Sequence, residues 1–143
     1  MNRADPPDDV DPAALAIAVD RLVETFVRED KRTRARKMLL GGRPKKASKL
    51  GPGSQRREAL QMMGSWIPRD WQRDLDRPAI NTLVAKLGAR PGVLIEPDHT
   101  YRRTVAEIVK HADEAVFIAD DASLAIVLFD VGSPTLCTKP KRR

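Results

Sequence analysis

Residues 115–129 read AVFIADDASLAIVLF, and this stretch decides the fold class. Two β-prone apolar runs, 115–119 and 124–129, flank a polar segment, DDAS, that is typical of a hairpin turn. Each run is apolar at successive positions, so both faces of the resulting sheet need cover. We therefore expect an antiparallel hairpin near the C-terminal end, with helices on one face and either more helix or a second subunit on the other.

The chain before this hairpin is mostly helical by pattern. Asp11 followed by Pro12 is a favourable helix start. An apolar stripe follows, and a helix continuous over residues 12–40 would be about 44 Å long. The stripe consists of Leu15, Val19, Leu22 and Phe26. Further helices are expected at 54–67, 78–87 and 100–112, with one more helical turn at 69–75 and a short strand at 93–95.

These elements predict an α+β protein, mostly helical, with a long N-terminal helix and a small C-terminal antiparallel sheet. We expect one domain over residues 11–131. The Pro- and Asp-rich residues 1–10 and the basic tail 132–143 are expected to be disordered, and residues 41–53 to form a basic linker within the domain.

The strongest functional signal is the stretch from 31 to 57, KRTRARKMLLGGRPKKASKLGPGSQRR, which has no Asp or Glu. Its eleven cations predict contact with the phosphate backbone of DNA or RNA with little sequence preference. The predicted nucleic-acid-binding residues are Lys31, Arg32, Arg34, Arg36, Lys37, Arg43, Lys45, Lys46, Lys49, Arg56 and Arg57.

Other interpretations of this stretch are a solvated linker, an arm folded onto the acidic remainder of the chain, and a docking site for an acidic protein. Electrostatic adsorption to a membrane is less favoured, since the stretch lacks a broad apolar face. A winged helix-turn-helix, with residues 78–87 or 100–112 as the reading helix and 120–123 as the wing, is disfavoured by two aspartates at the wing tip.

An enzymatic alternative rests on His99 in the sequence EPDHTYRR. A histidine beside Arg102 and Arg103 would suit metal-independent phosphodiester cleavage, as in a small ribonuclease or toxin. Asp98, His99, His111 and Cys137 lack the spacing of a zinc site. Trp66 and Trp71 are expected to be core anchors rather than platforms for bases.

We therefore predict a nucleic-acid-binding protein with no metal, cofactor or catalytic residue, of the kind that serves as a small regulatory or accessory factor. We favour this over the ribonuclease or a noncatalytic adaptor for an acidic protein. A single cysteine and the lack of a signal peptide or an apolar stretch long enough to cross a bilayer predict a cytoplasmic location without membrane insertion. The apolar stripe and the two-faced hairpin predict a homodimer.

Overall fold

The computed structural model describes residues 10–40, 52–110, 113–129 and 132–139. The α-helices are α1 (Pro12–Phe26), α2 (Arg32–Leu39), α3 (Pro52–Trp66), α4 (Arg77–Leu87) and α5 (Val105–Ile108). Two short 3₁₀ helices, η1 (Glu29–Lys31) and η2 (Arg69–Trp71), precede α2 and the first strand. The strands are β1 (Gln72–Asp74), β2 (Pro91–Ile95), β3 (Thr100–Thr104), β4 (Ala115–Ala119), β5 (Ala125–Leu128) and β6 (Thr135–Cys137).

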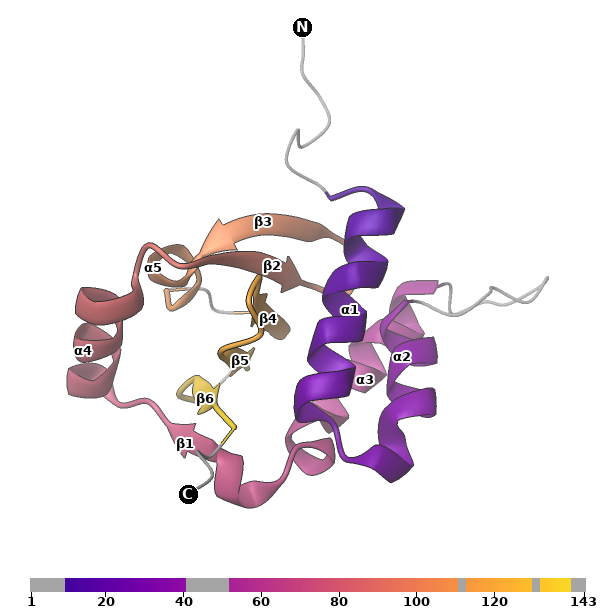
Figure 1. Cartoon of the computed structure of the whole chain (residues 1–143), viewed down its shortest axis with the longest axis horizontal. Helices are drawn as coiled ribbons and strands as arrows, with labels where there is room; N and C mark the ends of the chain where they lie inside the picture. The colour runs from indigo at the N-terminus through magenta and orange to yellow at the C-terminus, as the bar shows by residue number, and fades with distance from the viewer. Residues whose placement is uncertain (1–9, 41–51, 111–112, 130–131, 140–143) are drawn as a thin grey trace, which may run out of the picture.

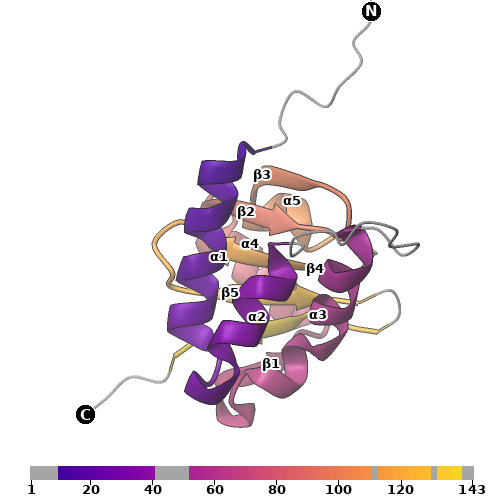
Figure 2. The ribbon, with the colours of Figure 1, turned by 90° about the vertical axis from the view of Figure 1, so that its right-hand side faces the viewer.

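All six strands form one antiparallel sheet in the order β1-β6-β5-β4-β2-β3. Helices α1, α2 and α3 cover one face of it, and α4 and α5 cover the other (Figures 1 and 2). The α+β class is confirmed. The predicted β4–β5 hairpin exists, but it is the centre of a six-stranded sheet rather than the whole of a small one.

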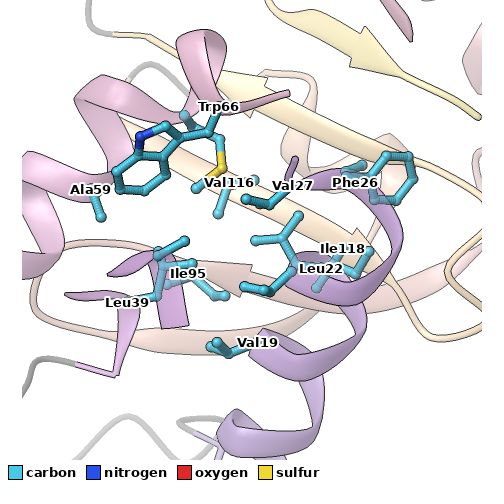
Figure 3. Close-up of a cluster of buried hydrophobic side chains, with 14 of the residues drawn as sticks. Val19, Leu22, Phe26, Val27, Leu39, Ala59, Trp66, Ile95, Val116 and Ile118 are labelled. Carbon is cyan, nitrogen blue, oxygen red and sulfur yellow. The ribbon is translucent and has the colours of Figure 1, made fainter. Parts of the chain in front are cut away.

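Alternation along the central strands explains why their sequences are apolar throughout. In β4, Val116 and Ile118 pack beneath α1–α3, whereas Phe117 packs on the side of α4 and α5. The first of these two cores also contains Leu22 and Trp66, both about 1% exposed or less (Figure 3). Burying a large apolar side chain contributes about 1.5–3 kcal/mol, so the two cores together account for much of the stability of the fold.

Both apolar surfaces that led us to expect a homodimer are covered by the chain itself. Val19, Leu22 and Phe26 of the N-terminal stripe are buried, and Leu15 packs against the same core. The second face of the hairpin is covered by α4 and α5. The homodimer therefore stays a prediction that has lost these two arguments.

The prediction of one long N-terminal helix is wrong. Val27 ends α1 in an extended conformation, and the Arg28 N–H donates to the Trp66 carbonyl oxygen at 2.9 Å. The chain then turns back through η1, so that Ala35 and Leu39 of α2 are fully buried. A continuous helix would carry these side chains away from the core into water.

The predicted helix over residues 100–112 is also wrong, since residues 100–104 form β3 and, of the described residues that follow up to 110, only Val105–Ile108 is helical; residues 111–112 lie outside the described chain. Pairing with β2 outweighs the helical spacing of the apolar residues, and a capping box between Thr104 and Glu107 starts α5 after the strand. The predicted turn after Pro68 is present as η2, but β1 follows it.

Part of the expected C-terminal tail is ordered structure. Thr135–Cys137 forms β6, which lies inside the sheet between β5 and β1, and Cys137 is fully buried. The predicted helices at 54–67 and 78–87 and the predicted strand at 93–95 are present as α3, α4 and β2, and the structure shows Asp76 as the N-cap of α4. In the parts of the chain described, no helix is both long and apolar enough to cross a bilayer.

Candidate nucleic-acid interface

The structure places seven of the eleven predicted cations on η1, α2 and α3. Arg43, Lys45, Lys46 and Lys49 lie outside the described residues. The helices on either side of that gap pack against each other (Figure 2). The described residues that flank the gap therefore lie in or next to two helices that contact each other.

Two of the seven cations hold α2 against α1. The Arg36 Nη2 atom lies 2.9 Å from an Asp20 carboxylate oxygen and 2.6 Å from one of Glu24, and the bond to Glu24 raises the pKa of Arg36. Arg32 donates to the Val27 carbonyl oxygen at 2.9 Å and lies 3.9 Å from Glu24. Their charge is therefore used within the chain, and we assign both to the fold.

Arg56 is a structural residue by its surroundings. Its Nε atom donates to the Leu39 carbonyl oxygen at 2.7 Å, and its Nη1 atom donates to the Glu96 carbonyl oxygen at 3.3 Å. The guanidinium thus joins the end of α2, the start of α3 and the β2–β3 turn. Burial lowers the pKa of Arg56, and nearby Asp98 opposes that shift.

Arg57 lies next in the chain but is exposed, and its Nη1 atom lies 3.6 Å from a Glu114 oxygen. Such an exposed pair contributes about 0–1 kcal/mol. Arg57 is therefore partly neutralised without being essential to the fold.

Three described cations remain. The side chains of Lys31, Arg34 and Lys37 have no hydrogen bond or ion pair to any other residue that the structure describes. Arg34 and Lys37 are exposed and lie three positions apart, which places them on one face of α2. Like charges at this spacing weaken a helix by a few tenths of a kcal/mol, and a bound anion would reverse that effect.

The cluster of His99, Arg102 and Arg103 on which the ribonuclease alternative rests is not present. Alternation along β3 sends Arg102 to one face, where it pairs with Asp120, and Arg103 to the other, where its guanidinium lies 4.6 Å from the Tyr101 ring centre. The His99 ring stacks on Tyr101 at 6.0 Å. Arg102 and Arg103 therefore do not converge on one phosphate.

The hollow beside His99 is acidic. It has a volume of about 240 Å³ and is lined by four carboxylates, His99, Arg57 and Pro97. The carboxylates are those of Glu96, Asp98, Asp113 and Glu114. A phosphodiester would be repelled here, which argues against the ribonuclease.

Among the described residues, no group of three or more His, Cys, Asp or Glu side chains is arranged so that it could hold a metal ion. His111 lies outside the described residues. Cys137, in β6, is four strands from β3, or about 19 Å at ordinary strand spacing. Burial raises the pKa of the Cys137 thiol to about 12, so it is neither a nucleophile nor a ready ligand.

The other predicted features have structural roles. Trp66 is buried and Trp71 packs edge-on against Phe26 with ring centres 6.2 Å apart, so both belong to the core. The two aspartates at the β4–β5 turn are paired, Asp120 with Arg102 and Asp121 with Arg90. Arginines of the same chain thus neutralise the turn.

Sequence reasoning missed one surface entirely. A hollow of about 520 Å³ lies between α4 and the β1–β6 edge of the sheet. Its lining residues come from the polar strand QRD, from α4 and from β6, which the sequence placed in a tail. The apolar period of α4 was the only signal that pointed there.

The comparisons with known proteins give no relative. No family model matches the chain, and neither a curated protein nor a solved structure matches it. The functional argument therefore rests on the residues and their geometry.

Proposed function

We propose that the protein binds the phosphate backbone of nucleic acid through seven cations of η1, α2 and the interval that follows α2. The observation that carries the proposal is the exposed face of α2, where Arg34 and Lys37 have no acidic partner among the described residues while Arg32 and Arg36 are neutralised. The proposed contacts are Lys31, Arg34, Lys37, Arg43, Lys45, Lys46 and Lys49. Arg32, Arg36, Arg56 and Arg57, which the sequence also suggested, are not part of this set.

The arrangement suits a flexible anionic polymer. The bond from Arg56 to the Leu39 carbonyl keeps the end of α2 beside the start of α3. Four of the seven cations belong to the interval between these points, which contains no acidic residue. A phosphate lattice requires charge density and reach rather than fixed geometry, so little sequence preference is expected.

The number of contacts sets the salt dependence. If four to seven cations each neutralise one phosphate, the logarithm of the association constant should fall with the logarithm of salt at a slope of about −4 to −6 on duplex DNA. Single strands should give a shallower slope, since each contact then counts for about −0.7.

Fluorescence anisotropy of labelled duplex DNA, single-stranded DNA and single-stranded RNA across a salt series tests the proposal. Replacing both Arg34 and Lys37 with alanine should flatten the duplex slope by about 2 units and weaken all sequences alike. The control removes two exposed cations from the other side of the sheet, Arg77→Ala with Lys110→Ala, and should leave the slope nearly unchanged.

Two results would refute the proposal: undetectable binding at low salt, or an α2 double variant that behaves like the control. Degradation of the probe by wild-type protein, abolished in His99→Ala, would favour the ribonuclease instead. We also propose a cytoplasmic location, in keeping with the single cysteine of the chain. It does not depend on whether the protein forms the homodimer.

A further inference from the structure

The two edges of the sheet differ in how their backbone groups are satisfied. On β3, the backbone N–H and C=O groups of Thr100, Arg102 and Thr104 point away from β2. The Thr100 carbonyl accepts from the Val10 N–H at 3.2 Å, and the Thr104 N–H donates to the Glu107 carboxylate at 2.8 Å. The Arg102 carbonyl accepts from the guanidinium of the following residue at 2.8 Å. This edge is largely closed to another strand.

The register of β1 determines what the opposite edge presents. The Trp71 carbonyl accepts from the Thr138 N–H at 3.0 Å, and the Leu75 N–H donates to the Pro134 carbonyl at 2.8 Å. Odd-numbered residues of this segment therefore bond to β6. Because hydrogen-bonding direction alternates along an antiparallel ladder, the backbone groups of Gln72 and Asp74 point away from β6, toward the open edge.

Most of these outward groups are available. The Gln72 N–H, at the C-cap of η2, donates to the carbonyl of Arg69, the first residue of that helix. The Gln72 carbonyl and both backbone groups of Asp74 have no partner in the part of the chain that the structure describes. β1 thus offers one donor and two acceptors in the spacing of a strand.

A groove runs alongside this open edge. It is the hollow of about 520 Å³ between α4 and the β1–β6 pair, a size typical of ligand and peptide pockets. Leu83, Leu87 and Leu136 supply apolar surface, and Arg73 points to the same side as its partner Leu136. A strand added to β1 would extend the sheet beneath α4 and place alternate side chains in the groove.

The groove has an excess of available positive charge. Arg73 and Lys86 have no ion pair with a described residue. Of the two aspartates in the lining, Asp74 accepts from the Thr135 hydroxyl at 3.2 Å and Asp76 caps α4. Acidic side chains of a ligand would therefore find cations whose charge is not used within the described structure.

We propose that β1 and this groove bind an extended, acidic peptide segment of a partner protein by strand addition. The peptide pairs with the outward backbone groups of Gln72 and Asp74. Its residue opposite Arg73 points into the groove and is acidic, and its neighbours on that face are apolar. This inference concerns the opposite side of the sheet from the nucleic-acid proposal and is independent of it.

A second copy of the chain fits this edge less well. A two-fold antiparallel pairing centred on Arg73 would set two guanidinium groups against each other, and one centred on Asp74 would oppose two carboxylates. Like charges directly opposite across a strand pair are destabilising. Self-pairing centred on either charged residue is therefore disfavoured, whereas an acidic partner is favoured.

A matched pair of variants isolates the backbone contact. Asp74→Pro removes the outward N–H without removing a ladder bond to β6, and proline is tolerated at such an edge position. Asp74→Ala removes the same carboxylate but keeps the N–H. A phage-displayed library of random peptides, selected on wild-type protein, supplies the probe, and enriched peptides are then synthesised for anisotropy measurements.

We expect acidic sequences with β-branched or apolar neighbours. They should bind Asp74→Ala about as tightly as wild type and Asp74→Pro at least about fivefold more weakly, since one backbone hydrogen bond is lost. If circular dichroism shows that Asp74→Pro does not fold, the double variant Arg73→Glu with Lys86→Glu replaces it as the test. This variant should abolish binding of the same peptides.

Three outcomes overturn the proposal. The first is no enrichment over a selection on Arg73→Glu with Lys86→Glu. The second is enriched peptides without acidic residues or with equal affinity for both Asp74 variants. The third is a wild-type dimer in light scattering that Asp74→Pro converts to a monomer, because the edge would then be occupied by a second copy.

Discussion

Replacing Arg56 with methionine should destabilise the fold without changing how the protein binds nucleic acid. The guanidinium donates to two carbonyl oxygens, at 2.7 Å to Leu39 and 3.3 Å to Glu96. Hydrogen bonds from a charged group contribute about 1.5–3 kcal/mol each, and the longer one counts at the low end. Methionine fills a similar volume and removes the cost of burying a charge, which offsets part of the loss.

The expected net loss is about 2–3 kcal/mol in the free energy of unfolding, or about 5–10 °C in Tm for a chain of this length. Urea denaturation followed by circular dichroism measures it. Arg57→Met is the control, because it removes the same charge one residue away and loses only a surface pair of about 0–1 kcal/mol.

Equal losses in the two variants would refute the structural role of Arg56. So would an intact fold whose salt slope on duplex DNA is flatter than that of wild type, since Arg56 would then contact phosphate. The two variants thus distinguish a structural role of Arg56 from contact with phosphate.

Two further predictions concern buried positions. A Cβ on Gly92 would lie 2.3 Å from the Ile118 carbonyl oxygen, so Gly92→Ala should lower the free energy of unfolding by about 3 kcal/mol in urea denaturation. The control is Gly64→Ala in α3, whose Cβ meets nothing closer than 3.9 Å and which should stabilise the protein by about 0.5–1 kcal/mol. Equal effects of the two substitutions would contradict the packing of β2 on β4. Cys137, with its pKa raised to about 12 by burial, should resist thiol-specific labelling at pH 8 until the protein is unfolded, and rapid labelling of the native state would show that β6 is not in place.

The predictable parts of the fold are those where local chemistry and tertiary packing agree. α4 has an N-cap at Asp76, proline at its second position and an apolar face around Leu83, so its boundaries follow from sequence. The β4–β5 hairpin has apolar runs around a polar turn. β1 and β6 have only three residues each, and the QRD of β1 has no β signal of its own. Their pairing holds them in place, and no local pattern encodes it.

The sequence predicts the total charge of the candidate interface, but not which of its cations are used within the fold and which are available to a ligand. Composition identifies eleven cations between residues 31 and 57. It does not show that Arg36 reaches Asp20 and Glu24 on the preceding helix, because that contact depends on the break after Val27. It also does not show that Arg56 is turned inward. Both assignments require the helix packing.

The place of β6 within the sheet has a consequence for how the chain folds. The β2–β3 and β4–β5 hairpins and the α1–α2 and α2–α3 pairs join segments near in sequence, whereas β6 reaches back to β1 across 61 residues, as between Thr135 and Asp74. Loop closure costs more entropy over this separation than within the hairpins, so we expect the β1–β6 pairing to form late. β1 is hydrogen-bonded to the sheet only through β6 among the described strands, so opening of β6 releases both. We therefore expect amide hydrogen exchange at this edge to be faster than in β4 and β5, so that the strand proposed to bind a partner also opens more readily than the centre of the sheet.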